Sequence, residues 1–141
     1  LMKIIGAIFP VPSRLIDSIF KGGRSVFVKP PTIYKDLKPG SKILFYASGQ
    51  IRAIVGEGTA KSVELMEPEA ALNKYGERIF LDQEELREYL RGKRRASKIL
   101  VIPLENVKLY KRPYRPKRFI TVGGKRLTQN EYGDIIKKVG D

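Results

Sequence analysis

Short apolar runs that end at glycine or proline constrain the fold of this chain more than any other feature of its sequence. Several runs alternate apolar with polar residues, as half-buried strands do, and few are long enough for a helix. Strands are therefore expected over residues 2–9, 25–29, 42–47, 51–55, 60–65, 98–103, 107–110 and 118–122. The stretches 98–103 and 107–110 are either one strand region around Pro103 or two shorter strands. The glycines on either side of Glu57 indicate a bulge or a sharp bend. This pattern favours an α+β fold, namely a small mixed β-barrel with two or three peripheral helices.

Helical spacing and capping residues mark the remaining elements. Ser13 is placed to cap a helix that ends at Gly22, and a D-x-x-E capping box opens another helix over residues 82–91. Apolar residues recur at helical spacing over residues 128–139, and a short helix is expected near residues 69–74.

The length of the chain suits one domain with a hydrophobic core. We expect residues 1–126 to form this domain and residues 127–141 to pack on it as a helical extension.

The residue types that the chain lacks exclude whole classes of function. It has no Cys and no His, which removes disulfides, Cys/His zinc sites, thiol nucleophiles and imidazole-based catalysis. Neither a metal nor a cofactor is expected. The longest apolar stretch, residues 4–11, is far shorter than the roughly 20 residues of a membrane span, and it does not resemble a signal peptide. The expectation is a soluble, cytoplasmic protein.

The net charge of +13 is unevenly distributed along the chain. Residues 62–90 carry 8 acidic and 3 basic side chains, whereas residues 91–126 carry 13 basic side chains and one acidic side chain. The fold should therefore present an acidic face and a basic face, and a basic face on a small domain is typical of nucleic-acid binding. The alternative is the charge-rich surface of a thermophilic protein, although such surfaces usually mix both signs.

Four stretches in the first half of the chain resemble a known superfamily. They are residues 22–29 (GGRSVFVK), 37–40 (LKPG), 43–46 (ILFY) and 54–58 (IVGEG). The chain resembles the PUA-like superfamily, in particular its ASCH and EVE branches, and it is similar to an uncharacterised archaeal family near these branches. Within the ASCH pattern G-x-K-T-x-E-x-R, the matching positions hold Gly22, Arg24, Ser25 and Lys29, and Phe27 replaces the Glu. The resemblance implies a mixed β-barrel with a cleft beside the first helix, and a role in binding structured or modified RNA.

The side chains at this expected cleft suit RNA. Arg24 can hold a phosphate or a guanine edge through two parallel hydrogen bonds, which Lys29 cannot do. Ser25 adds a hydroxyl group, and Tyr46 offers a ring face for stacking a base. In a regular strand Arg24 and Lys29 point to opposite faces, so both reach one ligand only if the strand end twists or the ligand wraps around the edge. The alternative is that these four are ordinary surface and core-rim residues.

A second group of candidate residues lies in residues 108–118, where cations alternate with prolines and tyrosines. We predict that this extended segment follows the phosphates of RNA while its aromatic rings stack on unpaired bases. The predicted contacts are Lys111, Arg112, Tyr114, Arg115, Lys117 and Arg118. The alternative is a solvated edge strand that continues into a linker.

RNA binding therefore has two rivals. A subset of ASCH proteins are amidohydrolases whose Lys, Thr and Glu act together, which here would act on acylated nucleosides, but Phe27 stands at one of these positions and Arg24 stands where their Lys acts. Phe supplies no nucleophile, and Arg does not lose its proton to become a base. The other rival is a protein-binding component of a ribosomal or RNA-processing complex, with the acidic residues 62–90 as its contact surface. The sequence leaves the oligomeric state open.

Overall fold

The computed structural model describes residues 3–31, 35–80, 98–118 and 120–140. They form an 8-stranded mixed sheet with the order β6-β2-β7-β4-β3-β1-β8, and β5 pairs with β7 beside this path. The strands are β1 (Ile4–Pro12), β2 (Val26–Lys29), β3 (Lys42–Ser48), β4 (Ala53–Ala60), β5 (Glu64–Met66), β6 (Ile79–Phe80), β7 (Ile99–Tyr114) and β8 (Lys125–Thr128). The predicted α+β class and mixed barrel-like sheet are confirmed. The described strands do not close into a ring, because β6 and β8 each have only one neighbour in this order.

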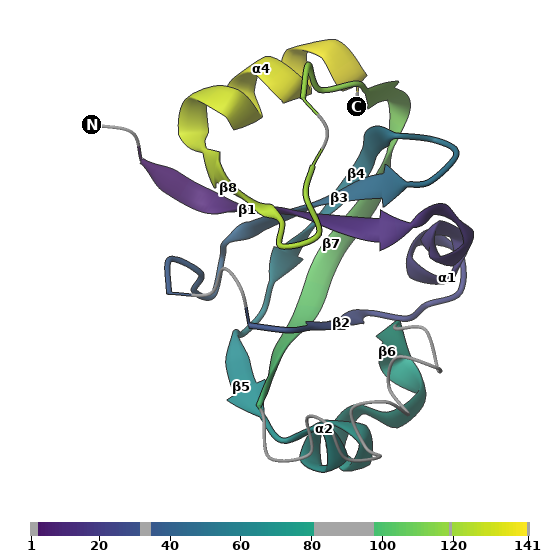
Figure 1. Cartoon of the computed structure of the whole chain (residues 1–141), viewed down its shortest axis with the longest axis vertical. Coiled ribbons are helices and arrows are strands. Elements are labelled where there is room, and N and C mark those ends of the chain that lie inside the picture. Colours follow the sequence, from purple (N-terminus) through teal and green to yellow (C-terminus); the bar gives the residue numbers. More distant parts are fainter. Residues whose placement is uncertain (1–2, 32–34, 81–97, 119, 141) are drawn as a thin grey trace.

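The helices lie at the two ends and one side of the sheet (Figure 1). A short α1 (Ile16–Phe20) follows a 3-10 turn, α2 (Pro68–Tyr75) lies at one end of the molecule, and α4 (Gln129–Val139) lies at the other. The helix expected over residues 82–91 lies outside the described residues. None of the described helices is long and apolar enough to cross a membrane.

The longest strand, β7, runs from the α2 end of the molecule to the α4 end (Figure 1). The sequence left open whether this region forms one strand around Pro103 or two shorter strands, and the structure shows one. Pro103 stays within the strand, since its carbonyl accepts a hydrogen bond of 2.8 Å from the backbone of Lys61. The first residues of β7 pair with β2 and β5, and from Leu104 onward β7 pairs with β4 across two register shifts.

The first strand differs from the expectation at its end. It was predicted to stop at Pro10 but continues to Pro12, where it pairs with β3 alone. A strand with one neighbour tolerates the missing N–H of proline. Ser13 does not cap the helix that follows, because its hydroxyl group donates to the carbonyl of Ser48 at 2.6 Å.

A strand was expected over residues 118–122, but none of the described residues there, 118 and 120–122, lies in a strand. A turn closes instead, with the backbone N–H of Gly124 donating to the carbonyl of Thr121 at 2.9 Å, and β8 begins after it. The side chain of Thr128 then accepts from the backbone of Glu131, whose side chain accepts from the backbone of Thr128, so that a capping box opens α4.

The described residues form three apolar clusters. The largest contains Phe9, Phe27, Phe45 and Phe80, whose neighbouring rings lie 5.2–5.8 Å apart. The second lies between the sheet and α4, and the third lies beside α2. Gly56 lets the ring of Phe20, the last residue of α1, pack closely against β4, because a Cβ atom at Gly56 would lie 2.4 Å from this ring.

Candidate nucleic-acid interface

Cations are exposed along the second half of β7 and the segment that follows it. We call this set the basic strip: Lys108, Lys111, Arg112, Arg115, Lys117 and Arg118. Within the described part of the chain, none of the six forms an ion pair. The guanidinium group of Arg115 is fixed by a hydrogen bond of 2.7 Å to the carbonyl of Ile51. The positive charge of the strip is therefore available to a partner.

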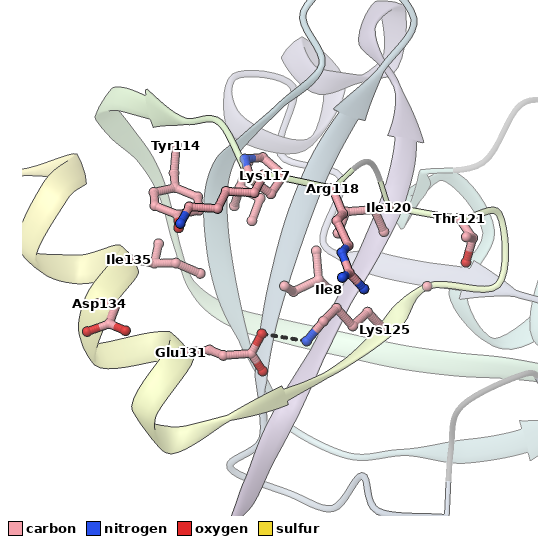
Figure 2. A pocket seen from close by; sticks show the side chains of 13 residues that line it. Ile8, Tyr114, Lys117, Arg118, Ile120, Thr121, Lys125, Glu131, Asp134 and Ile135 are labelled. Atoms are coloured by element: carbon pink, nitrogen blue, oxygen red, sulfur yellow. Dashed lines mark hydrogen bonds and ion pairs between the residues drawn. The ribbon is translucent and has the colours of Figure 1, made fainter.

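The basic strip ends at a cavity of about 450 Å³ (Figure 2). The cavity lies between α4, the start of β8 and the segment that joins β7 to β8. Its apolar lining includes Ile8, Ile54, Tyr114, Ile120 and Ile135. Its charged lining is Lys117, Arg118, Lys125, Glu131 and Asp134. Three residues predicted from the sequence, Tyr114, Lys117 and Arg118, therefore meet at one hollow.

Two of the charged groups at the cavity neutralise each other. Lys125 and Glu131 form a short ion pair that also includes a hydrogen bond. Although burial opposes the effect, the hydrogen bonds from Lys125 and from the backbone of Thr128 hold the pKa of Glu131 below its usual value. Among the described residues, Lys117, Arg118 and Asp134 form no ion pair. The cavity thus presents two available cations and one available carboxylate.

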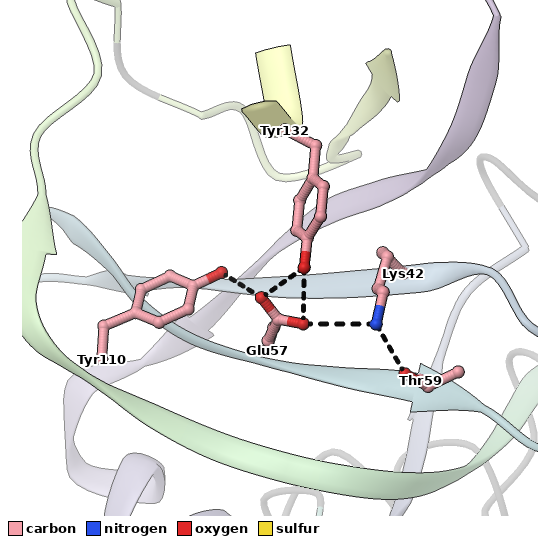
Figure 3. Close-up of polar contacts among 5 residues, drawn as sticks. All are labelled: Lys42, Glu57, Thr59, Tyr110 and Tyr132. Carbon is pink, nitrogen blue, oxygen red and sulfur yellow. Dashed lines mark hydrogen bonds and ion pairs between the residues drawn. The ribbon is translucent and has the colours of Figure 1, made fainter. Parts of the chain in front are cut away.

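A buried carboxylate fixes α4 over the sheet (Figure 3). Glu57 is only 2% exposed, and the hydroxyl groups of Tyr110 on β7 and Tyr132 on α4 each donate to it at 2.9 Å. Lys42 lies 3.5 Å from the same carboxylate and donates to Thr59. Burial, followed by the charge of Glu57, raises the pKa of Tyr110, so this hydroxyl group keeps its proton. These contacts hold one wall of the cavity in place.

The residues predicted for a cleft beside the first helix are spread over the fold. Arg24 donates to the carbonyl of Ile79 at 3.1 Å, and Ser25 accepts from Arg78 at 3.4 Å. Lys29 lies at the far end of β2, about 16 Å from Arg24 along an extended chain. The geometry does not bring Arg24 and Lys29 to one ligand.

Lys29 is buried although it carries a charge. Its side-chain nitrogen lies 4.3 Å from the centre of the Phe9 ring and donates to the carbonyl of Val122 at 3.3 Å. Burial lowers the pKa of Lys29 to about 8. Lys29 therefore ties the segment before β8 to the core, a role that differs from the predicted contact with RNA.

Tyr46 is 5% exposed and packs in the second apolar cluster. A ring this deeply buried has no open face for a base, so Tyr46 is not part of the site proposed below. Phe27, which replaces the Glu of the ASCH pattern, is 4% exposed among the other phenylalanines of the core. Neither residue reaches a ligand at the surface.

Sequence reasoning missed the residues that α4 and β8 contribute to the cavity, such as Lys125 and Asp134. The T-x-x-E spacing of Thr128 and Glu131 indicates where α4 begins, but no sequence pattern indicates which surface this helix covers. In the described ranges, no three acidic side chains gather as a metal site would require.

The whole arrangement is similar to that of known proteins. The ASCH protein of Zymomonas mobilis, in the crystal structure of a point variant, superimposes with a TM-score of 0.82 at 15% identity and covers 99% of this chain and 100% of that one. The N-terminal domain of McrB from Staphylothermus marinus has a TM-score of 0.56 at 16% identity, with 98% of each chain covered. These likenesses confirm the ASCH-type, PUA-like fold.

Sequence comparison points in the same direction. The uncharacterized protein MJECS03 of Methanocaldococcus jannaschii is 37% identical over 107 residues, which cover 70% of this chain and 99% of that protein. This relative agrees with the predicted similarity to an uncharacterised archaeal family. A family model described as a domain of unknown function, DUF365, matches residues 4–129, and the chain therefore belongs to the DUF365 family.

Proposed function

We propose that this protein binds RNA through the basic strip. The observation that carries the proposal is the run of six exposed cations without a carboxylate partner in the described structure. Exposed, unpaired cations attract the phosphates of a nucleic acid, and binding releases the counterions of the backbone.

The shape of the strip suits an extended strand of RNA. Residues Lys108 and Arg115 are seven positions apart along β7 and its continuation, which corresponds to about 23 Å of extended chain. A track of this length covers a short single-stranded site of at least about four nucleotides. The cavity at the end of the track favours RNA with unpaired nucleotides, as in loops and bulges, over a regular duplex.

The charge at the opposite end of the molecule also favours binding of an anionic ligand at the basic strip. Around β5 and α2 the exposed or half-buried side chains include Glu64, Glu67, Glu69 and Glu77, which outnumber the cations Lys74 and Arg78 although Lys74 pairs with Glu64. This end lies away from α4 (Figure 1). An anionic ligand is repelled there and attracted at the α4 end. The charge distribution thus orients the protein so that the basic strip faces RNA as the two molecules approach each other.

Fluorescence anisotropy with labelled single-stranded RNA, hairpin RNA and single-stranded DNA of matched sequence tests the proposal. Each titration is repeated at several salt concentrations. We expect an RNA with unpaired nucleotides to bind most tightly and to remain bound at physiological salt. Equal binding of all three that disappears as salt is raised would reduce the interaction to nonspecific attraction and would refute the proposal.

A further inference from the structure

We propose that the cavity beside α4 holds one unpaired nucleobase of the bound RNA, with the adjoining phosphate against Lys117 and Arg118. This inference rests on the proposed function and adds to it a defined subsite. The cavity has a volume of about 450 Å³, which is within the range of sites for small organic ligands. It also opens directly from the basic strip, so a nucleotide can enter it without leaving the phosphate track.

The walls of the cavity suit a flat aromatic group. In Figure 2, Tyr114 and Ile135 lie on one side, Arg118 and Ile120 lie on the other, and Ile8 lies between them. Lys138 lies 5.7 Å from the centre of the half-buried Tyr114 ring but does not line the cavity, whereas the ring does. The Tyr114 ring and the guanidinium plane of Arg118 are the two groups of the lining that can stack on a base. The apolar floor then covers the edge of the base that makes no hydrogen bonds.

The charges at the cavity suit a nucleotide better than a simple anion. Lys117 and Arg118 are available for a phosphate, whereas the available carboxylate of Asp134 repels an anion that enters without a hydrogen-bond donor. A nucleotide satisfies both sides, because it joins a phosphate to a base with N–H groups that can donate to Asp134. Asp134 is therefore the residue expected to influence which base is accepted.

The cavity is formed before any ligand arrives. Tyr132 anchors α4 to the buried Glu57, and Lys29 holds the opposite segment through the carbonyl of Val122. Gly124 allows that segment to approach the sheet, since a Cβ atom there would lie 2.7 Å from the Phe9 ring. A cavity with fixed walls loses little freedom when it binds a ligand.

The test uses the full chain labelled with ¹⁵N and titrated separately with the four nucleoside 5′-monophosphates and with ribose 5-phosphate. We expect saturable shifts of the backbone signals of residues 114, 120, 121 and 135 with at least one monophosphate. Ribose 5-phosphate should produce at least fivefold weaker binding, because it lacks the base. Equal shifts with ribose 5-phosphate, or no shifts at these residues with any monophosphate, would overturn the inference.

Two variants separate the subsite from the basic strip. Tyr114→Leu keeps an apolar wall but removes the ring, and we expect it to weaken monophosphate binding at least fivefold while the salt dependence of RNA binding is unchanged. Arg112→Ala is the matched control, because Arg112 belongs to the strip but does not line the cavity. It should weaken RNA binding and leave monophosphate binding within twofold. A loss of monophosphate binding in Arg112→Ala but not in Tyr114→Leu would contradict the assignment.

The two proposals fail in different ways. If RNA binds with the expected salt dependence but no monophosphate reaches the cavity, the subsite is refuted and the basic strip stands. If monophosphates bind at the cavity but RNA of every form fails to bind, the cavity is a nucleotide site and the proposed function is refuted.

Discussion

The two halves of β7 belong to one strand but contribute to the molecule in opposite ways. Residues 99–104 are buried without exception, and Leu100 and Val101 among them pair with strands on both sides, whereas in residues 105–114 only Tyr110 is buried. The first half is a continuous apolar run that pairs with β2, β5 and the end of β4. The second half exposes its cations to solvent. Folding and the proposed RNA binding should therefore be separable by substitutions only a few residues apart.

The largest effect is expected from a leucine pair that differs only in its half of the strand. Leu100 is fully buried, so Leu100→Ala should lower the free energy of unfolding by about 2–5 kcal/mol. Leu109 is 50% exposed, and Leu109→Ala should change the free energy of unfolding by less than about 0.5 kcal/mol. Urea denaturation measures both. Similar losses in the two variants would show that the halves do not differ as described.

The next effect concerns Lys29, which pairs with Leu100 in the buried half. Its pKa is about 8 in the folded protein and about 10.4 in an unfolded chain. Between these values the unfolded chain binds this proton and the folded protein does not, so the free energy of unfolding rises with pH. Below pH 8 the buried Lys29 keeps its charge, so the free energy of unfolding is lowered by the full cost of burying it.

We expect a rise of about 1–3 kcal/mol between pH 8 and pH 10, and no such rise in Lys29→Met. Above pH 10 the raised pKa of Tyr110 acts in the opposite direction, because the folded protein then holds a proton that the unfolded chain releases. Denaturation at several pH values up to 10 gives the slopes. Identical slopes in the wild type and Lys29→Met would contradict the burial of this charge.

A smaller effect distinguishes two tyrosines in the second half of β7. Tyr110→Phe removes the hydrogen bond to the buried Glu57 and should cost about 1–2 kcal/mol of stability, because that carboxylate loses a donor. Tyr114→Phe is the matched control, since in the described structure the hydroxyl group of Tyr114 has no hydrogen bond. It should change stability by less than about 0.5 kcal/mol. Thermal denaturation that ranks the two variants in the opposite order would overturn the account of the Glu57 contacts.

Sequence patterns predicted most of the strands because buried strands need continuous or alternating apolar residues, and those runs are readable. They did not predict the end of β1, since proline is tolerated where a strand has a single neighbour. They also predicted the same role for Tyr46 and Tyr114, namely stacking on a base. Both are tyrosines of similar context, and their burial differs because of the way the second apolar cluster packs under α4.

The candidate site was only partly predictable for the same reason. The cations of residues 108–118 stand out in the sequence, since the one nearby acidic residue, Glu105, cannot pair with all of them. The position of Lys29 in the core does not stand out, because a lysine at the end of a strand is usually exposed. The cavity itself depends on where α4 docks, and docking is fixed by Tyr132 and Glu57, which are 75 residues apart in the chain.

The salt dependence of RNA binding in strip variants tests the central claim most directly. For Arg112→Ala/Arg115→Ala, anisotropy titrations over a range of salt should show at least about tenfold weaker binding, together with a slope of log K against log salt that is smaller by about 1.4, the value for two lost phosphate contacts on a single strand. Lys38→Ala/Lys61→Ala removes the same charge from two exposed residues outside the strip and should leave the slope nearly unchanged. Equal effects of the two double variants, or no effect of either, would contradict RNA binding by the basic half of β7.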